Sequence, residues 1–315
     1  MATGGPVKRI LVIKLGALGD VVQALGPMAA IRDHFKGAHI TVLTRKPFDS
    51  LIMASGIADA VIFDLKPAVW NIPGWLVVRR MLRGGAFDQV FDLQTSKRSS
   101  TYFKLFWPSK PVWSGIAAGC ALPHNNPNRD HMHTLERQAE QLHMAGIETV
   151  PAPSLNGIDP DLSTLGLPPS FTMLVPGGAG HRPDKRWPAS KYRDLAQRLD
   201  SSTSPAVVVG TAEEQALGAE IIADAPNAVN MAGKTSLLQL IGIAKAAKAA
   251  VGNDSGPMHV AAVAGTPSVV LYSEDSDPAL CAQRGADVTI LRRPSLDALG
   301  VDDVMQALPT SLGGS

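Results

Sequence analysis

Short apolar runs alternate along the chain with longer segments in which apolar residues recur at helical spacing. The runs predict strands at 9–13, 39–43, 60–63, 89–91, 108–116, 171–175, 206–210, 228–231, 248–251, 268–272 and 288–291. The periodic segments predict helices at 21–35, 48–54, 74–82, 134–145, 190–199 and 296–308, with further helices opening after 96, 210, 231 and 255. Most of the runs lack polar alternation, which is typical of strands buried on both faces of a parallel sheet. The pattern predicts an α/β fold of parallel sheets covered by helices on both faces.

A proline-rich segment divides the chain into two halves. Residues 150–170 show little apolar periodicity, which is typical of a connection between domains. The length of 315 residues also favours about two domains. We therefore predict an N-terminal domain at 1–155 and a C-terminal domain at 156–315, each with its own sheet.

The turn at 251–259 has the composition of an anion-binding helix start. A predicted strand end is followed by Asp254 and Ser255 as capping residues, and Pro257 suits the first helical turn. Free backbone N–H groups and the positive end of the helix dipole attract anions there, and Ser255 and Gly256 let a phosphate approach the backbone. The turn therefore predicts a phosphate site, with an ordinary capped helix as the alternative.

Other loops of the C-terminal half also follow strands and therefore reach the same edge of the predicted sheet. The loops at this edge are residues 176–187, 210–214 and 252–259, of which the first is rich in glycine. Lys185 and Arg186 would add positive charge there, a combination that suits a diphosphate. The alternative for Lys185 is a solvated surface lysine.

A second glycine turn follows the first predicted strand. Gly16 and Gly19 indicate close backbone approach, yet the full three-glycine dinucleotide fingerprint is absent. Ligands of doubly wound folds gather at the carboxyl ends of the strands. The polar residues that fall at this edge are Asp20, Gln94, Ser96 and Arg98. Asp20 has the alternative role of an ordinary helix cap.

Composition argues against several other classes of function. Lys and Arg number 29 against 28 Asp and Glu, so we expect no nucleic-acid partner. The histidines at 124, 131 and 133 (His124, His131 and His133) lack metal-ligand spacing, so we expect no metal. Cys120 and Cys281 lie far apart and predict reduced thiols in a cytoplasmic protein. No run approaches the roughly 20 apolar residues of a membrane span.

Five motifs span nearly the whole chain in order. They are Ile-Leu-Val-Ile-Lys-Leu-Gly-Ala-Leu-Gly-Asp-Val at 10–21, Phe-Asp-Leu-Gln at 91–94, Pro-Gly-Gly-Ala at 176–179 with Lys-Arg-Trp-Pro at 185–188, Gly-Lys-Thr-Ser-Leu at 233–237, and Gly-Asn-Asp-Ser-Gly-Pro-Met-His at 252–259. Together they resemble the bacterial glycosyltransferase family that contains the lipopolysaccharide heptosyltransferases, glycosyltransferase family 9.

This resemblance implies a GT-B fold of two facing Rossmann-like domains. The N-terminal domain would bind the acceptor, and the C-terminal domain would bind the nucleotide-sugar donor, ADP-heptose. The family transfers heptose with inversion at the anomeric carbon and uses no metal; we expect no cofactor. The implied acceptor is a lipopolysaccharide-type or other cell-surface glycan that is linked to a lipid. A lipid-linked acceptor in turn implies that the protein makes peripheral contact with the inner face of the cytoplasmic membrane.

The resemblance also implies roles for individual residues. Asp20 would be the catalytic base. The donor would be bound by Lys185, Gly178, Asp254, Ser255, Gly256 and His259, with Glu213 or Glu214 at the ribose. The acceptor would be bound by Gln94, Ser96 and Arg98.

One segment departs from the family pattern. Residues 273–277 are acidic, where the family commonly has a glycine and a short polar loop, and this leaves the donor sugar open. A nucleotide-sugar epimerase of the same architecture and a non-catalytic nucleotide-binding module remain alternative interpretations. The missing third glycine argues against a nucleotide-dependent dehydrogenase.

Overall fold

The chain folds into two compact units, each built on its own sheet. The structure, a computed structural model, describes residues 7–178, 183–200 and 204–310. The units are Met1–Ser154 (unit 1) and Leu155–Ser315 (unit 2). Each unit contains a six-stranded sheet whose strand pairs are all parallel. The predicted α/β class with parallel sheets is confirmed.

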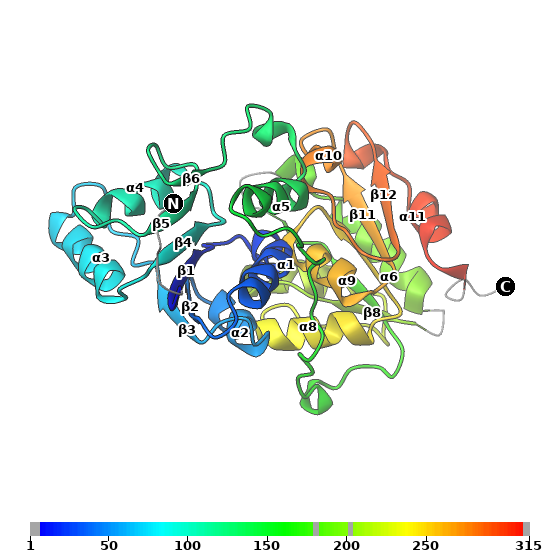
Figure 1. The fold of residues 1–315 in the computed structure, drawn as a ribbon. Helices are drawn as coiled ribbons and strands as arrows, with labels where there is room; N and C mark the ends of the chain where they lie inside the picture. The colour runs from blue at the N-terminus through cyan, green and yellow to red at the C-terminus, as the bar shows by residue number, and fades with distance from the viewer. Residues whose placement is uncertain (1–6, 179–182, 201–203, 311–315) are drawn as a thin grey trace. The chain divides into compact units, whose positions relative to one another are not determined.

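Unit 1 alternates strands and helices, except that its last two strands follow each other without a helix between them. Its elements are β1 (Arg9–Ile13), α1 (Leu18–His34), β2 (His39–Thr44), α2 (Phe48–Ala54), β3 (Ala60–Phe63), α3 (Ile72–Gly84), β4 (Gln89–Asp92), α4 (Lys97–Leu105), β5 (Val112–Gly115), β6 (Leu122–Pro123), η1 (Arg129–His131) and α5 (Thr134–Met144). The continuous apolar run of β1 is explained by helices on both faces of the sheet. Leu11 and Ile13 pack with Leu82 of α3 and Tyr102 of α4, while Val12 between them is equally buried. Helices α1, α2 and α5 cover the face opposite α3 and α4 (Figure 1).

Unit 2 repeats this alternation. Its elements are η2 (Ser163–Leu165), β7 (Thr172–Val175), η3 (Pro183–Lys185), α6 (Ala189–Asp200), β8 (Ala206–Val208), η4 (Ala212–Glu214), α7 (Gln215–Ile221), β9 (Val229–Asn230), α8 (Leu237–Ala246), β10 (Ala249–Asn253), α9 (Gly256–Ala264), β11 (Ser268–Tyr272), α10 (Pro278–Cys281), β12 (Val288–Arg292), η5 (Leu296–Ala298) and α11 (Val301–Ala307). Leu174 and Val251 pack with side chains of α6, α7 and α11 in one core cluster. Helices α8 and α9 pack together, and α9 contacts β10 and β11.

Both sheets have the strand order of a doubly wound fold. The order is β3-β2-β1-β4-β5-β6 in unit 1 and β12-β11-β10-β7-β8-β9 in unit 2. In each unit the chain builds one half of the sheet, then returns to the middle and builds the other half. The loops after β1 and β4, and those after β7 and β10, therefore leave their sheet in opposite directions. A doubly wound fold binds its ligands at this switch point.

Three predicted elements differ from the observed ones. Strand β5 is shorter than the predicted 108–116, because Pro108 and Pro111 have no N–H to give to a ladder. The segment predicted as a loop at 121–133 contains β6, in which Leu122 pairs with Ser114. The single helix predicted at 296–308 is divided into η5 and α11, because the backbone is extended at Gly300, with φ −75° and ψ 154°.

Candidate functional site

The loop after β1 brings a lysine and a carboxylate together at the switch point of unit 1. Lys14 is buried, and its Nζ donates a hydrogen bond to the carbonyl oxygen of Leu93 at 3.3 Å. Lys14 Nζ also lies 3.9 Å from Asp20 Oδ1. Burial lowers the pKa of Lys14, and the charge of Asp20 opposes that shift. The loop thus holds a buried amine beside the predicted base.

Asp20 supports the start of α1 and also faces solvent. Its Oδ2 accepts a hydrogen bond from the backbone N–H of Ala17 at 3.0 Å. The capping role weighed for Asp20 is therefore present in the structure. The side chain is nevertheless 43% exposed. Because the cap engages only one carboxylate oxygen, capping and proton transfer are compatible roles.

Gln94 and Ser96 shape the loop after β4. Gln94 Oε1 accepts a hydrogen bond from the backbone N–H of Leu15 at 2.8 Å, which ties this loop to the one after β1. Ser96 is the N-cap of α4, and its hydroxyl oxygen accepts from the N–H of Ser99. Asp92 Oδ1 accepts from the N–H groups of Gln94 and Thr95 at 3.1 and 3.0 Å. Both predicted acceptor residues thus have a local structural role at the switch point.

Arg98 belongs to a cluster around a buried carboxylate, Asp64, that sequence reasoning missed. Arg98 and Arg45 each form an ion pair with Asp64, at 2.8 and 2.6 Å, and the Tyr102 hydroxyl donates to it at 2.6 Å. Burial would raise the pKa of Asp64, but hydrogen bonds from Arg98, Tyr102 and Arg45 hold it well below its usual range. The positions of Arg45 after β2 and Asp64 after β3 were the available signal, since adjacent parallel strands bring their following residues together.

A buried amide, Asn253, joins the loops after β7 and β10 in unit 2. Asn253 Nδ2 donates to the carbonyl oxygens of Pro176 and Gly177 at 2.8 and 3.2 Å. Asn253 Oδ1 accepts from the backbone N–H of Trp187 at 3.0 Å and lies 3.1 Å from the Tyr192 hydroxyl. The side chain is fully buried. Asn253 therefore holds the two ends of the glycine-rich loop against the β10 turn.

Asp254 was expected to cap α9, and the structure corrects this. Its carboxylate contacts Lys185 instead, with 3.2 Å between Oδ2 and Nζ. The buried Ser276 hydroxyl donates to the same oxygen at 2.5 Å and contacts Lys185 Nζ, and Gln283 Nε2 donates to Oδ1. Burial raises the pKa of Asp254, but the Ser276 hydrogen bond and the Lys185 charge hold it below its usual value.

Ser276 is the residue of the acidic segment 273–277 that reaches the contact between Lys185 and Asp254. Its side chain is buried, whereas Glu274, Asp275 and Asp277 are exposed. Asp277 accepts from the N–H of Ala279 and so caps α10. The negative charge that set this segment apart from the family pattern therefore faces solvent.

The start of α9 presents a polar atom that lacks a partner. Ser255 is in the N-cap position, yet its side chain makes no capping hydrogen bond. Its hydroxyl oxygen is buried without a hydrogen-bond partner among the described residues. Gly256 is the first residue of α9, and His259 is buried one turn further along. Backbone N–H groups and a buried hydroxyl thus gather where a phosphate site was predicted.

The structure distinguishes the two candidate glutamates. Glu214 Oε1 accepts from the N–H of Gly178 at 3.2 Å, and Oε2 accepts from the N–H of Thr211 at 2.7 Å. A Cβ on Gly177 would lie 1.9 Å from Glu214 Oε1, so a larger residue there would displace the Glu214 carboxylate from this position. Glu213 is exposed. Glu214 therefore lies against the glycine-rich loop, of which residues 179–182 are outside the described part of the chain.

Two of the histidines considered as metal ligands make contacts within the fold, and the two cysteines are not joined to each other. His124 Nε2 lies 2.8 Å from Glu140 Oε2, and His133 Nδ1 accepts from the N–H of Leu135 at the start of α5. Cys120 and Cys281 are both free thiols. Within residues 7–178, 183–200 and 204–310, no group of three or more His, Cys, Asp or Glu side chains could hold a metal ion. In the same part of the chain, no helix has the length and apolarity needed to cross a bilayer.

Two doubly wound parallel sheets, each with polar groups at its switch point, define the GT-B class of fold, and the comparisons agree. The model of glycosyltransferase family 9 (heptosyltransferase) matches residues 75–297. The chain belongs to this family. The family predicted from the five motifs is therefore confirmed.

Individual relatives agree with the family assignment. Lipopolysaccharide heptosyltransferase 2 of Salmonella typhimurium is 40% identical over 104 residues, which is 31% of this chain and 30% of that protein. The aligned stretch thus spans less than a third of that relative. The structure of ADP-heptose lps heptosyltransferase II of Escherichia coli has a TM-score of 0.82 at 22% identity, covering 96% of this chain and 98% of the other. Heptosyltransferase WaaC of Escherichia coli, solved with ADP, has a TM-score of 0.76 at 20% identity, with coverages of 95% and 98%. These two structures share the fold.

Proposed function

We propose that this protein is an inverting, metal-independent glycosyltransferase that moves heptose from ADP-heptose to a lipopolysaccharide-type acceptor. One observation carries the proposal: Lys185 stands beside the α9 start, where the Ser255 hydroxyl oxygen is buried without a partner among the described residues. A buried polar atom without a partner is costly, and a bound phosphate oxygen would satisfy it. The free thiols Cys120 and Cys281 support a reducing, cytoplasmic setting for the reaction.

The donor diphosphate occupies the α9 start in this proposal. The N–H groups of the first helical turn and the Ser255 hydroxyl donate to phosphate oxygens, and Lys185 supplies a full positive charge. Gly178 lines the approach, while Glu214 rather than the exposed Glu213 accepts from a ribose hydroxyl. The ADP bound in the related WaaC structure supports adenine as the base, and the buried His259 lies on the same helix.

Asp20 is the base in the proposed reaction. The acceptor hydroxyl oxygen attacks the anomeric carbon from the face opposite the diphosphate, and its proton passes to the Asp20 carboxylate. The bond between the anomeric carbon and the phosphate oxygen breaks, and ADP leaves. The hydrogen bond from Ala17 fixes one oxygen of Asp20, so the second can take the proton. Single displacement of this kind inverts the anomeric configuration.

Lys185 and the α9 dipole stabilise the charge that develops on the departing ADP, which is the task a metal performs in other transferases. Asp254 and Ser276 hold the Lys185 ammonium in place, so its position is prepared before the donor binds. Preorganised charge of this kind lowers the barrier, because it needs no rearrangement during the reaction.

The acceptor site is proposed at the unit 1 switch point, at Gln94, Ser96 and Arg98. Gln94 and Ser96 set the backbone of the loop after β4. Arg98 and Arg45 share the buried Asp64, so two arginines and one carboxylate leave a net positive charge there. A net positive charge suits an acidic sugar of an inner-core acceptor.

A transfer assay tests the proposal. The full chain is incubated with ADP-heptose and a lipopolysaccharide acceptor that lacks heptose, in the presence of a metal chelator. We expect ADP release that depends on the acceptor, together with an acceptor that is heavier by one heptose. ADP-heptose converted to an isomer without acceptor would indicate an epimerase instead. Binding of ADP without either product would indicate a non-catalytic module.

A further inference from the structure

Unit 1 exposes a group of large apolar side chains at the start of α3. Val69 and Trp70 are 85% and 84% exposed, and Ile72, Leu76 and Val77 are all more than half exposed. These five residues, here called the α3 surface, fall within nine consecutive positions of the chain. Scattered exposed apolar residues need no explanation, but a concentration of this kind indicates an interaction surface.

The α3 surface is not the packing face of its helix. Val78 and Leu82 are the side chains through which α3 joins the unit 1 core. The turn before the helix is fixed, because Trp75 Nε1 donates to the carbonyl oxygen of Ala68 at 3.1 Å and the Asn71 side chain caps the helix. The exposed side chains are therefore held outward by an ordered turn.

A second exposed tryptophan lies beside α3. Trp107, at the end of α4, is 65% exposed. Arg79, in the middle of α3, donates to the carbonyl oxygen of Trp107 at 2.8 Å, which ties α3 to the end of α4. Helices α3 and α4 lie side by side on the same face of the unit 1 sheet (Figure 1). Tryptophan is the side chain most typical of the boundary between lipid and water.

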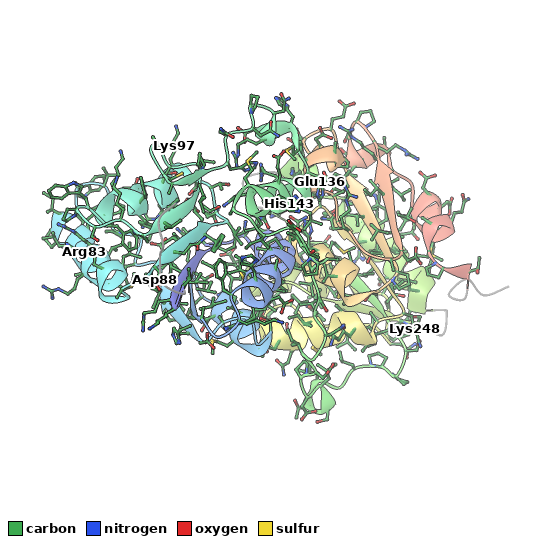
Figure 2. All side chains as sticks on the ribbon, in the orientation of Figure 1. Arg83, Asp88, Lys97, Glu136, His143 and Lys248 are labelled. Atoms are coloured by element: carbon green, nitrogen blue, oxygen red, sulfur yellow. The ribbon has the colours of Figure 1, made fainter. Side chains whose placement is uncertain are left out.

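The surroundings of these apolar side chains are basic. Residues 65–87 and 93–129 contain no Asp or Glu. The exposed basic residues of this face are Lys66, Arg80, Arg83, Lys97, Lys104 and Lys110. Figure 2 marks Arg83 on α3 and Lys97 at the start of α4.

The nearby acids do not cancel this charge. Asp64 is buried between two arginines, and Asp92 is buried at the switch point. Asp88 lies at the end of the sheet where α3 finishes, but its Oδ2 accepts hydrogen bonds from the backbone N–H groups of two further basic residues, Lys8 and Arg9. The outer face of α3 and α4 therefore carries an excess of positive charge.

We propose that the α3 surface docks the protein on an anionic lipid bilayer. The apolar side chains at the start of α3 enter the interface, and the arginines of its last turns contact lipid phosphates. Apolar side chains joined to a basic rim are the pattern of helices that lie in a membrane surface. The charge argues against a second copy of this chain as the occupant, because two such faces would repel each other. This inference does not depend on the sugar donor.

Vesicle sedimentation of the full chain tests the proposal. One set of vesicles contains phosphatidylcholine alone, and the other contains a quarter phosphatidylglycerol. We expect binding to the anionic set that weakens with salt. The double substitution Val69→Ser/Trp70→Ser and the double substitution Arg80→Glu/Arg83→Glu should each reduce the bound fraction by about tenfold. Their thermal unfolding should match the wild type, because all four side chains are exposed.

Matched controls separate this surface from general effects. Met144→Ser removes an exposed apolar side chain from α5, and Lys248→Glu reverses an exposed charge in unit 2 (Figure 2). Neither should alter vesicle binding. Equal binding to both vesicle sets, or wild-type binding by the Val69→Ser/Trp70→Ser variant, would overturn the proposal. Dimerisation that is lost in that variant would overturn it in favour of a second copy. No arm uses a nucleotide sugar, so failure here leaves the transfer proposal intact.

Discussion

Lys185 Nζ lies 3.2 Å from Asp254 Oδ2, although 69 positions separate the two residues. The contact joins the loop after β7 to the loop after β10, and Ser276 bridges the pair from the segment after β11. Three carboxyl-end loops of one sheet therefore meet around a single ammonium group. In the proposed reaction this ammonium group belongs beside the α9 start, where a diphosphate would receive it.

Removing the Lys185 charge should weaken nucleotide binding without unfolding the protein. Lys185→Met keeps most of the side-chain volume but removes a charged donor, which should cost about 10- to 100-fold in ADP affinity. Isothermal titration calorimetry with ADP measures the effect. Lys248→Met is the matched control, because Lys248 is exposed just before β10, at the opposite end of that strand. Equal ADP affinity in the two variants would show that Lys185 does not contact the phosphates.

Asn253 should matter for stability as well as for binding. Asn253→Ala leaves the carbonyl oxygens of Pro176 and Gly177 and the N–H of Trp187 without their partner. Unsatisfied buried groups cost stability, so the free energy of unfolding should fall by about 3 kcal/mol. Chemical denaturation measures this loss, and ADP affinity should fall with it because the loop after β7 is released. An unfolding free energy equal to that of the wild type would contradict the linking role.

Asp92 should make the stability of unit 1 depend on pH. Burial raises the pKa of Asp92 to about 6, against the opposing hydrogen bonds at its carboxylate. The pKa of Asp in an unfolded chain is about 4, so the folded state binds the Asp92 proton more tightly than the unfolded state does. The stability that Asp92 contributes is therefore complete below about pH 4 and is lost as the pH rises through about 6. Asp92→Asn keeps an oxygen for the two backbone N–H donors and removes this loss.

Chemical denaturation between pH 4 and 8 measures the Asp92 effect. The unfolding free energy of Asp92→Asn, relative to wild type, should increase with pH by up to about 3 kcal/mol and level off above pH 7. Asp33→Asn, on the exposed side of α1, controls for the loss of a carboxylate. A difference between Asp92→Asn and wild type that stays constant across this range would mean that Asp92 titrates normally.

Features that depend on residues close together in the chain could be predicted from the sequence. The turn between β10 and α9 was predictable because a buried strand end, a serine in the N-cap position and an early proline occur next to each other. The edge positions of Asp20 and Gln94 were predictable because parallel strands share a carboxyl edge. Even the capping bond of Asp20 was an expected alternative, since it spans only three residues.

Side-chain partners that lie far apart in sequence could not be predicted in this way. Asp254 was expected to cap its helix, but its carboxylate is taken by Lys185, Ser276 and Gln283 from three other segments. Asn253 stands inside the same motif, yet its partners lie across the sheet. Which of several polar residues turns inward depends on packing across strands, and no single stretch of sequence contains that information.

The measurement that tests the proposed base most directly compares transfer with binding in Asp20→Asn. The amide keeps an oxygen for the Ala17 N–H but cannot accept the proton of an acceptor hydroxyl. We predict that heptose transfer from ADP-heptose falls by about 100-fold or more, while ADP affinity and thermal stability stay near the wild type. Transfer at the wild-type rate in Asp20→Asn would contradict the assignment of Asp20 as the base and, with it, the proposed mechanism.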